Sequence, residues 1–532
     1  MDTISDFADG FAVAATPTNL VLVLVGVLLG MVIGVLPGLG PTTTIAILLP
    51  VTFALDAPSA IILLAGIYYG AMYGGTITSV LVKVPGEIAS VVTTFDGHQM
   101  ARQGRAGPAL GIAAIGSFIG GIAATFMLVL LAKPLASFAE RFGAPELFLV
   151  AVIGIVLVLA MGGQSLPRAG AMVAVGLIVA SVGQDPVTGS GRFTFGSLEM
   201  LGGLDLVAIA MGLFGLSEVL SNVGKGSAQT PLAAKVDGIM PNKQDFKDSA
   251  GPIARGTVLG SLIGLVPGGG SVLASMASYS VERKISKHPE KFGHGAIEGV
   301  AGPETANNAG STMSFLPLLT LGLPTGTVMA LLYGALLLQG VTPGPTLVSE
   351  HPEIFWGVMA SMLIGNVMLL VLNLPLVGLF VQLLRVRMGI ISAVTVIVTL
   401  VGVYSLNNSM FDVVTCIIAG VVGYFMRRFG FQPGPLVLAA VLGSILEINL
   451  RNSLAISDGS ASIFVTRGIS LVMVAVLVLV VIGLASSTFR GKRKQTTEKI
   501  HDLVEAAEHE TDLTADDLTS AEPGSTQRSR HV

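Results

Sequence analysis

The sequence predicts an all-α, polytopic membrane protein with about 12 membrane segments that form two inverted repeats. Of its 532 residues, 52% are hydrophobic and only 12% are charged, whereas a soluble domain carries about 25% charged residues. Apolar stretches of roughly 20 residues, enough to cross a bilayer, recur along most of the chain. A Gly- and Pro-rich segment also occurs twice, so each repeat is expected to contain one re-entrant helical hairpin broken by Pro and Gly.

The membrane segments follow from hydropathy, because charged residues are nearly absent from them. Most of the 67 Gly residues lie inside or beside these runs, where Gly permits close helix packing. In chain order the predicted segments are Leu20–Leu36, Ser59–Val82, Ala109–Ala132, Glu146–Met161, Leu166–Val182, Leu204–Leu220, Gly326–Gln339, Ile354–Leu384, Gly389–Tyr404, Val413–Met426, Leu436–Ile448 and Gly468–Ala485. Two further apolar regions, Leu36–Leu55 and Gly256–Thr325, are interrupted by Pro and Gly and do not fit simple spans.

Basic residues predict the orientation, because Lys and Arg concentrate in cytoplasmic loops. Arg490, Lys492, Arg493 and Lys494 follow the last segment and place the C-terminus in the cytoplasm. The N-terminus then lies outside, on the periplasmic face. The same count leaves Lys133 outside, against the usual charge bias.

The orientation also divides the chain. Residues 1–220 are expected to form the first transmembrane repeat, and residues 256–486 the second. Residues 221–255, which carry several Lys, are expected to be a cytoplasmic linker. Residues 487–532 form a polar cytoplasmic tail whose composition favours disorder.

The repeated segment matches itself at an offset of 230 residues (256 minus 26), between residues 26–40 and 256–270. Both copies contain G-x-x-x-G-x-x-x-G and end in P-G-x-G. The Gly face lets a helix pack backbone to backbone, and Pro followed by Gly interrupts the helix. Interrupted backbone at membrane depth is tolerated where it lines a protein cavity, so two matched breaks predict the site of a transporter.

The charge pattern makes the first copy enter from outside and the second from the cytoplasm. The two hairpins are therefore predicted to be inverted. Inverted repeats give a protein two nearly equivalent states that open to opposite sides, which is the basis of alternating access.

Two sets of residues are candidates for the transport site. Backbone N–H groups at the start of a helical segment, with hydroxyl and amide side chains, suit a carboxylate. The predicted substrate-binding residues are Gly38, Gly40, Thr42, Thr43, Thr44, Gly268, Gly270, Ser271, Asn307, Asn308 and Thr325. Hard oxygen ligands suit Na⁺, and the predicted cation-binding residues are Glu304, Asn307, Thr76 and Thr327. For any single Ser or Thr, a hydrogen bond to its own helix is the alternative.

Motifs of other function classes are missing from the sequence. There is no G-x-x-x-x-G-K-[ST] loop for ATP and no H-E-x-x-H metal motif. One cysteine, Cys416, excludes an intramolecular disulfide framework. We therefore expect no enzyme activity and no cofactor, and the energy for transport must come from an ion gradient or from another subunit.

These residues resemble the large membrane subunit of the tripartite tricarboxylate transporter family (TctA family). The resemblance rests on four stretches, Gly34–Pro50, Ala65–Glu87, Thr93–Leu110 and Gly302–Thr346. It implies a multi-pass protein of the bacterial inner membrane that takes up tricarboxylates or related carboxylates by cation symport, with Na⁺ or H⁺ as the coupling ion. It also implies two partners, a small membrane subunit and a periplasmic solute-binding protein. An ion or anion channel and a membrane scaffold subunit remain the alternatives.

Overall fold

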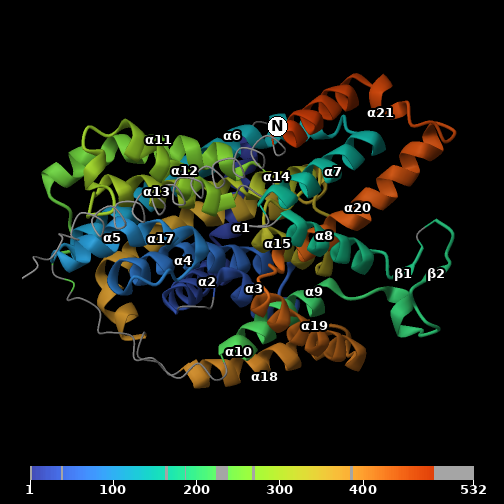
Figure 1. The fold of residues 1–532 in the computed structure, drawn as a ribbon, viewed down its shortest axis with the longest axis horizontal. Coiled ribbons are helices and arrows are strands. Elements are labelled where there is room, and N and C mark those ends of the chain that lie inside the picture. Colours follow the sequence, from blue (N-terminus) through green and yellow to red (C-terminus); the bar gives the residue numbers. More distant parts are fainter. Residues whose placement is uncertain are drawn as a thin grey trace, which may run out of the picture. The chain divides into compact units, whose positions relative to one another are not determined.

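The computed structural model describes residues 3–36, 40–161, 166–185, 187–222, 236, 238–266, 270–383 and 388–483. Helices dominate these ranges, and two short strands form the one small sheet found in them. In chain order the elements are α1 Thr3–Ala14, α2 Pro17–Val35, α3 Pro41–Leu48, η1 Leu49–Ala54, α4 Ala57–Val82, η2 Ile88–Val91, α5 Thr93–Arg102, α6 Ala106–Ala139, α7 Ala144–Met161, α8 Leu166–Ala180, β1 Gly183–Gln184, β2 Gly191–Arg192, η3 Glu199–Gly202, α9 Leu206–Ala210, η4 Met211–Leu216, α10 Ser217–Asn222, α11 Lys243–Gly264, α12 Gly270–Ile285, η5 Pro289–Lys291, α13 Glu298–Met313, α14 Phe315–Leu321, α15 Thr327–Leu338, α16 Leu347–Glu350, α17 Pro352–Leu383, α18 Met388–Asn407, α19 Met410–Arg428, α20 Gly434–Ile456 and α21 Ile463–Thr466 (Figure 1).

Every predicted membrane segment falls on helical residues, but only some of these helices are long enough to cross a bilayer. Among the described residues, six helices meet that length and composition: Pro17–Val35, Ala57–Val82, Ala106–Ala139, Pro352–Phe380, Met410–Arg428 and Gly434–Ile456. The other predicted segments correspond to shorter apolar helices. For example, α15 has 12 residues, or about 18 Å of helix, against a hydrocarbon core of about 30 Å. The fold is that of a multi-pass, all-α membrane protein, and the predicted number of segments stays a prediction.

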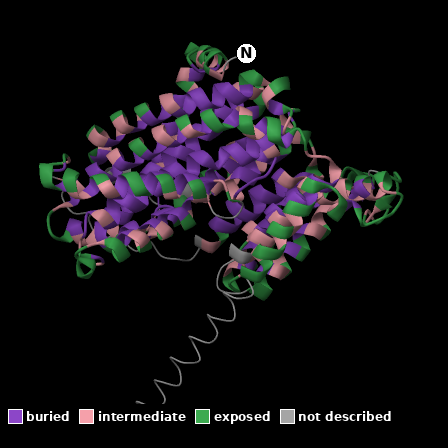
Figure 2. Cartoon of the chain, turned by 90° about the horizontal axis from the view of Figure 1, so that it is seen from above, coloured by how far each residue is buried: buried purple, intermediate pink, exposed green. Residues whose placement is uncertain are grey.

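Two helices are almost completely covered by others. The apolar stretch of α4 that is long enough to cross a membrane is fully buried. Every residue of α13 from Gly299 onwards is also buried. Buried residues fill the interior in Figure 2, while exposed side chains lie along the outer helices. Large apolar side chains such as Leu130 and Ile397 are exposed, as expected where lipid is the solvent.

The repeated Gly runs pack two pairs of helices in the same manner. On α2, a methyl group added to Gly30 would lie 2.8 Å from the Cα of Gly70 in α4. On α11, a methyl group added to Gly260 would also lie 2.8 Å from a Cα, that of Ala306 in α13. Real Cβ contacts are longer, so only Gly allows these backbone approaches. The predicted backbone-to-backbone packing of both copies is confirmed.

Both Gly-rich helices end where the sequence predicts an interruption. Helix α2 ends at Val35, and the next described helix, α3, begins at Pro41. Helix α11 ends at Gly264, and α12 begins at Gly270. Of the predicted hairpin tips, Pro37–Thr44 and Pro267–Ser271, residues 37–39 and 267–269 lie outside the described residues.

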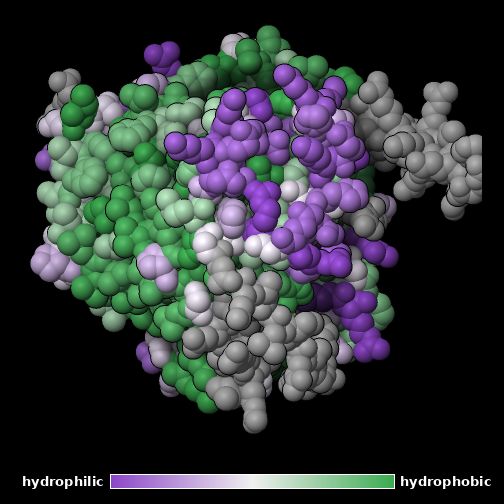
Figure 3. Space-filling model, turned by 90° about the vertical axis from the view of Figure 1, so that its left-hand side faces the viewer, coloured by the Kyte–Doolittle hydropathy of each residue, from purple (hydrophilic) through white to green (hydrophobic). Residues whose placement is uncertain are grey.

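Three segments that carry several basic residues, around residues 83–105, 243–255 and 283–296, meet at one end of the molecule. Arg105, at the start of α6, forms an ion pair with Asp245 in the first turn of α11. Asp96 of α5 accepts hydrogen bonds of 2.8–2.9 Å from the backbone N–H groups of Gly293, Gly295 and Ala296, just before α13. Helices α5 and α11 lie on the left of Figure 1, and Figure 3 shows a hydrophilic patch on that side. The exposed Lys and Arg residues of these segments include Lys83, Arg102, Lys243, Lys247, Arg255, Arg283, Lys284, Lys287 and Lys291.

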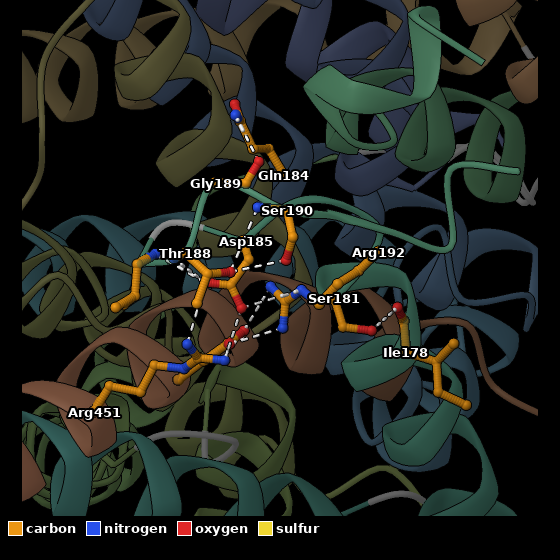
Figure 4. Close-up of polar contacts among 11 residues, drawn as sticks. Ile178, Ser181, Gln184, Asp185, Thr188, Gly189, Ser190, Arg192 and Arg451 are labelled. Atoms are coloured by element: carbon orange, nitrogen blue, oxygen red, sulfur yellow. Dashed lines mark hydrogen bonds and ion pairs between the residues drawn. The ribbon is translucent and has the colours of Figure 1, made fainter. Parts of the chain in front are cut away.

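A small β-hairpin between α8 and α9 carries a cluster of ion pairs. Strands β1 and β2 are antiparallel, with Gly183 opposite Arg192. Arg192 forms two hydrogen bonds of 2.8 and 3.1 Å to Glu447 of α20. Arg451 of α20 forms two, of 3.1 and 2.9 Å, to Asp185 of the hairpin (Figure 4). These paired charges hold the hairpin against the end of α20.

Lys133 has an acidic partner. The predicted orientation places this residue outside, although basic residues usually lie in cytoplasmic loops. Its Nζ lies 2.7 Å from Asp6 Oδ2 in α1. This pairing reduces the charge that Lys133 would otherwise place on the outer face.

The chain divides into two compact units, Met1–Met473 and Val474–Val532. All of the pairings above lie within the first unit. The described part of the second unit is the end of an apolar helix, Gly468–Gly483. The predicted polar tail, residues 487–532, lies outside the described residues.

Candidate functional site

The polar middle of α13 faces α4 and is enclosed by helices. Glu304 Oε2 accepts a hydrogen bond of 2.7 Å from the Thr76 hydroxyl of α4. Glu304 Oε1 accepts a second bond, from the Thr93 hydroxyl at the start of α5. All three side chains are buried, and Glu304 is only 1% exposed. A carboxylate from one half of the chain is therefore bound by two hydroxyls from the other half.

A second buried carboxylate, Glu87, lies in the loop that follows α4. Its Oε1 accepts a bond of 3.1 Å from Asn307 Nδ2, one helical turn after Glu304. Its Oε2 accepts a bond of 2.7 Å from the backbone N–H of Ala89. The remaining amide atom, Asn307 Oδ1, is buried and has no hydrogen-bond partner among the described residues.

Neither carboxylate has a basic partner among the described residues. In the described part of the chain no Lys, Arg or His forms an ion pair with Glu87 or Glu304. The two carboxylates are close enough for their charges to repel each other. Buried charges in proteins are normally paired or neutralised by protonation, so these two carboxylates require a cation or a proton.

The contacts fix the relative directions of the helices. In the first pair, Gly26 packs at Leu63 and Gly34 packs at Gly75, so α2 and α4 run parallel. In the second pair, Gly256 packs at Gly302 and Gly264 at Gly310, so α11 and α13 are also parallel.

The two pairs run in opposite directions. Thr76 of α4 lies beside Glu304 of α13. Earlier in α4, the Tyr69 ring lies 5.8 Å from that of Phe315, which comes after α13. Position along α4 therefore decreases as position along α13 increases, so the pairs are antiparallel.

The end of each Gly-rich helix reaches this polar region. A methyl group on Gly86, directly before Glu87, would touch Gly34, near the end of α2. The Ser314 hydroxyl donates a bond of 3.3 Å to the Gly264 carbonyl at the end of α11. The Tyr68 hydroxyl of α4 faces Ser311 of α13 and Ser271 of α12. Both interrupted regions therefore adjoin the contact between α4 and α13.

The predicted residues of the first break are partly placed. Gly38 lies outside the described residues. Gly40 caps the N-terminus of α3, and its carbonyl accepts a bond of 3.1 Å from Thr44. Thr43 donates a bond of 3.4 Å to the Phe214 carbonyl of η4. Thr42 is half-buried. Thr44 thus follows the alternative in which a hydroxyl bonds to its own helix.

The second break follows a similar arrangement. Gly268 lies outside the described residues. Gly270 opens α12 with φ of 47°, a left-handed conformation that favours Gly. Ser271 follows it and is buried.

The remaining predicted residues divide into two groups. Asn308 is in the cluster, because its Nδ2 donates bonds of 2.7 Å to Ser117 of α6 and 3.1 Å to the Glu304 carbonyl. Thr325 is buried between α14 and α15, and its hydroxyl has no partner among the described residues. Thr327 begins α15 and faces Gly434 at the start of α20. No described contact joins Thr327 to Glu304, and its role stays a prediction.

Sequence reasoning missed Glu87, Thr93 and Ser117. Glu87 and Thr93 follow a membrane segment and stand near Lys83, so they resemble part of a cytoplasmic loop. One sequence signal could have identified Glu87. It directly follows Pro85-Gly86, a Pro-Gly pair like those that end both copies of the repeated segment.

Comparison with known proteins gives a family match and two relatives. The model of the tripartite tricarboxylate transporter TctA family matches residues 20–438. An uncharacterized 52.8 kDa protein of Agrobacterium vitis, from the TAR-I ttuC' 3' region, is 50% identical over 494 residues, covering 93% of this chain and 98% of that protein. An uncharacterized protein from the TAR-II ttuC' 3' region of the same organism is 52% identical over 237 residues, covering 44% of this chain and 98% of that protein. No solved structure gives a significant match.

Proposed function

The chain belongs to the tripartite tricarboxylate transporter TctA family, and from this premise we propose that it is the membrane subunit of a binding-protein-dependent secondary transporter. The substrates are tricarboxylates or related carboxylates, and uptake is coupled to Na⁺ or H⁺. The partners are a small membrane subunit and a periplasmic solute-binding protein. The chain lies in the bacterial inner membrane, with its N-terminus periplasmic and its C-terminus cytoplasmic.

One observation carries the transport mechanism. Two helix pairs, each held by one copy of the repeated Gly run, are antiparallel to each other and meet through buried polar groups. This arrangement supports two inverted repeats, residues 1–220 and 256–486. Relative movement of such repeats exposes a shared site to either side in turn.

The chemistry of the contact region suits both solutes. The N-terminal ends of α3 and α12, next to the two interruptions, offer backbone N–H groups to a substrate carboxylate. Hydroxyl groups from Ser271, Ser311 and Tyr68 lie nearby. The carboxylates of Glu304 and Glu87 would repel a polycarboxylate, so they are better suited to the coupling cation.

Counterflow in liposomes tests this function. The purified complex is reconstituted with unlabelled citrate inside and labelled citrate outside, under imposed Na⁺ or H⁺ gradients. A transporter accumulates label transiently by exchange, whereas a channel only equilibrates it. Absence of exchange with citrate and with a panel of other di- and tricarboxylates would contradict the proposal.

A scaffold role is tested with Glu304→Ala and Asn307→Ala in the same assay. Both variants should insert normally and lose exchange. Normal exchange by both variants would separate transport from this cluster.

A further inference from the structure

When Glu87 and Glu304 are both ionised, no described neighbour compensates their negative charge. Every hydrogen bond recorded to either carboxylate comes from a neutral donor: the Thr76 and Thr93 hydroxyls, the Ala89 N–H and the Asn307 amide. Such donors stabilise ionised carboxylates but cancel no charge. Since both groups are buried, removing them from water is costly unless a cation accompanies them.

A second, independent observation concerns the side-chain amide of Asn307. Its Nδ2 donates to Glu87, while its Oδ1, on the same amide group, is buried without a partner among the described residues. Exchanging the two amide atoms would not remove the problem, because the oxygen would then face the Glu87 carboxylate and be repelled. A buried amide oxygen that no described group satisfies, on the side chain that binds Glu87, can serve as a ligand to a cation.

We propose that Glu87, Glu304 and Asn307 bind one Na⁺ ion at the contact between the two halves of the chain. The proposal assigns a cation and a second carboxylate to the coupling site, and it rests on the proposed function for its role in transport. Carboxylate and amide oxygens are hard ligands that suit Na⁺. A multidentate transition-metal site is a poor match, because no group of three or more His, Cys, Asp or Glu side chains that could hold a metal is found in the described ranges.

The position of the ion explains how it can act on conformation. Glu87 belongs to the first half, together with Thr76 and Thr93, whereas Glu304 and Asn307 belong to the second. An ion bound by both halves favours the state in which α4 and α13 are in contact. When the ion leaves, repulsion between the carboxylates favours their separation.

Equilibrium binding of radiolabelled Na⁺ to the purified full-length protein tests the proposal without requiring transport. The wild type should show saturable binding that excess NaCl displaces and excess KCl does not. Glu87→Gln should weaken Na⁺ binding by at least about tenfold. Glu447→Gln is the matched control, because Glu447 is paired with Arg192 and Arg451 and should leave Na⁺ binding unchanged.

Asn307→Ala provides a second variant, because it leaves both carboxylates and removes the unpartnered oxygen. It should also weaken Na⁺ binding, and size-exclusion chromatography establishes that each variant remains folded. Absence of saturable Na⁺ binding by the wild type, or wild-type affinity in folded Glu87→Gln, would overturn the proposal.

The test separates this proposal from the proposed function. Carboxylate exchange driven by protons, without Na⁺ binding, would overturn the Na⁺ site and leave the transporter assignment standing. Na⁺ binding that depends on Glu87, without exchange of any carboxylate, would support the site and contradict the transporter assignment.

Discussion

Two clusters in this protein each contain two carboxylates, but their partners differ. In the outer cluster, at the β-hairpin, Asp185 and Glu447 are bound by Arg192 and Arg451. In the inner cluster, Glu87 and Glu304 receive hydrogen bonds only from neutral groups, as far as the structure describes them. The outer cluster thus contains its own cations, and the inner cluster does not.

The difference indicates what each cluster is for. Arginines that are part of the chain hold the outer carboxylates permanently, which suits a structural role. A permanent cation would be useless where an ion must arrive and leave. The inner cluster has no tethered cation among the described residues, and this is what the proposed coupling site requires.

The largest expected effect is loss of transport when the inner charge is removed. Glu304→Gln keeps the size of the side chain but removes the charge that binds the cation. Initial rates of carboxylate uptake, normalised to inserted protein, should fall by roughly 100-fold. Glu447→Gln should reduce the rate by less than about twofold. Similar losses in the two variants would remove the distinction between the clusters.

A substitution that adds a positive charge to the inner cluster tests the difference between the two clusters. In Asn307→Lys an ammonium group replaces the amide that donates to Glu87, so the inner cluster comes to resemble the outer one. The variant should remain folded and should lose the stabilisation by Na⁺, which we expect to be several degrees in the wild type. Retention of that stabilisation in thermal unfolding would place the ion elsewhere.

Removing a cation from the outer cluster should have a smaller effect. Arg451→Gln leaves Asp185 and Glu447 with Arg192 only, and the hairpin should lose about 1 kcal/mol of local stability. Hydrogen exchange of residues 183–192 measures this loss. NaCl should not restore protection more than KCl does, since the hairpin is built around tethered cations.

The smallest effect is the acid sensitivity of the hairpin. Hydrogen bonds from the backbone N–H groups of Thr188 and Val187, together with Arg451, lower the pKa of Asp185 to about 2. Because this pKa is below the unfolded value of about 3.9, the contribution to stability is present above pH 4 and is lost as the pH falls towards 2. Hydrogen exchange should report this loss in the wild type and not in Asp185→Asn. A transition between pH 5 and pH 8 would contradict the assignment.

Much of the architecture follows from local sequence. The Gly spacing predicts backbone contact because Gly residues four apart share one helix face, and the contacts of Gly30 and Gly260 confirm it. Low charge and long apolar runs are enough to predict the membrane class. Helix length is harder to predict from the sequence. Short helices such as α15 are covered by neighbouring helices, so their sequences are as apolar as those of membrane-spanning helices.

Only some residues of the candidate site can be identified from the sequence. Glu304 and Asn307 attract notice because they are polar within an apolar stretch. Glu87 does not, because it lies in a loop beside Lys83, and its burial depends on α13 folding back against that loop. Such a contact between distant segments has no local sequence pattern.

Thermal unfolding of the purified wild-type chain in NaCl and in KCl, at equal ionic strength, measures most directly whether Na⁺ completes the inner cluster. A ligand that binds only the native state raises stability by about 2.7 kcal/mol at 100 times its Kd. We predict a higher Tm in NaCl for the wild type and for Glu447→Gln, and equal Tm values in the two salts for the Glu87→Gln/Glu304→Gln double variant. Equal Tm values in NaCl and KCl for the wild type, or an undiminished Na⁺ effect in the double variant, would contradict the account.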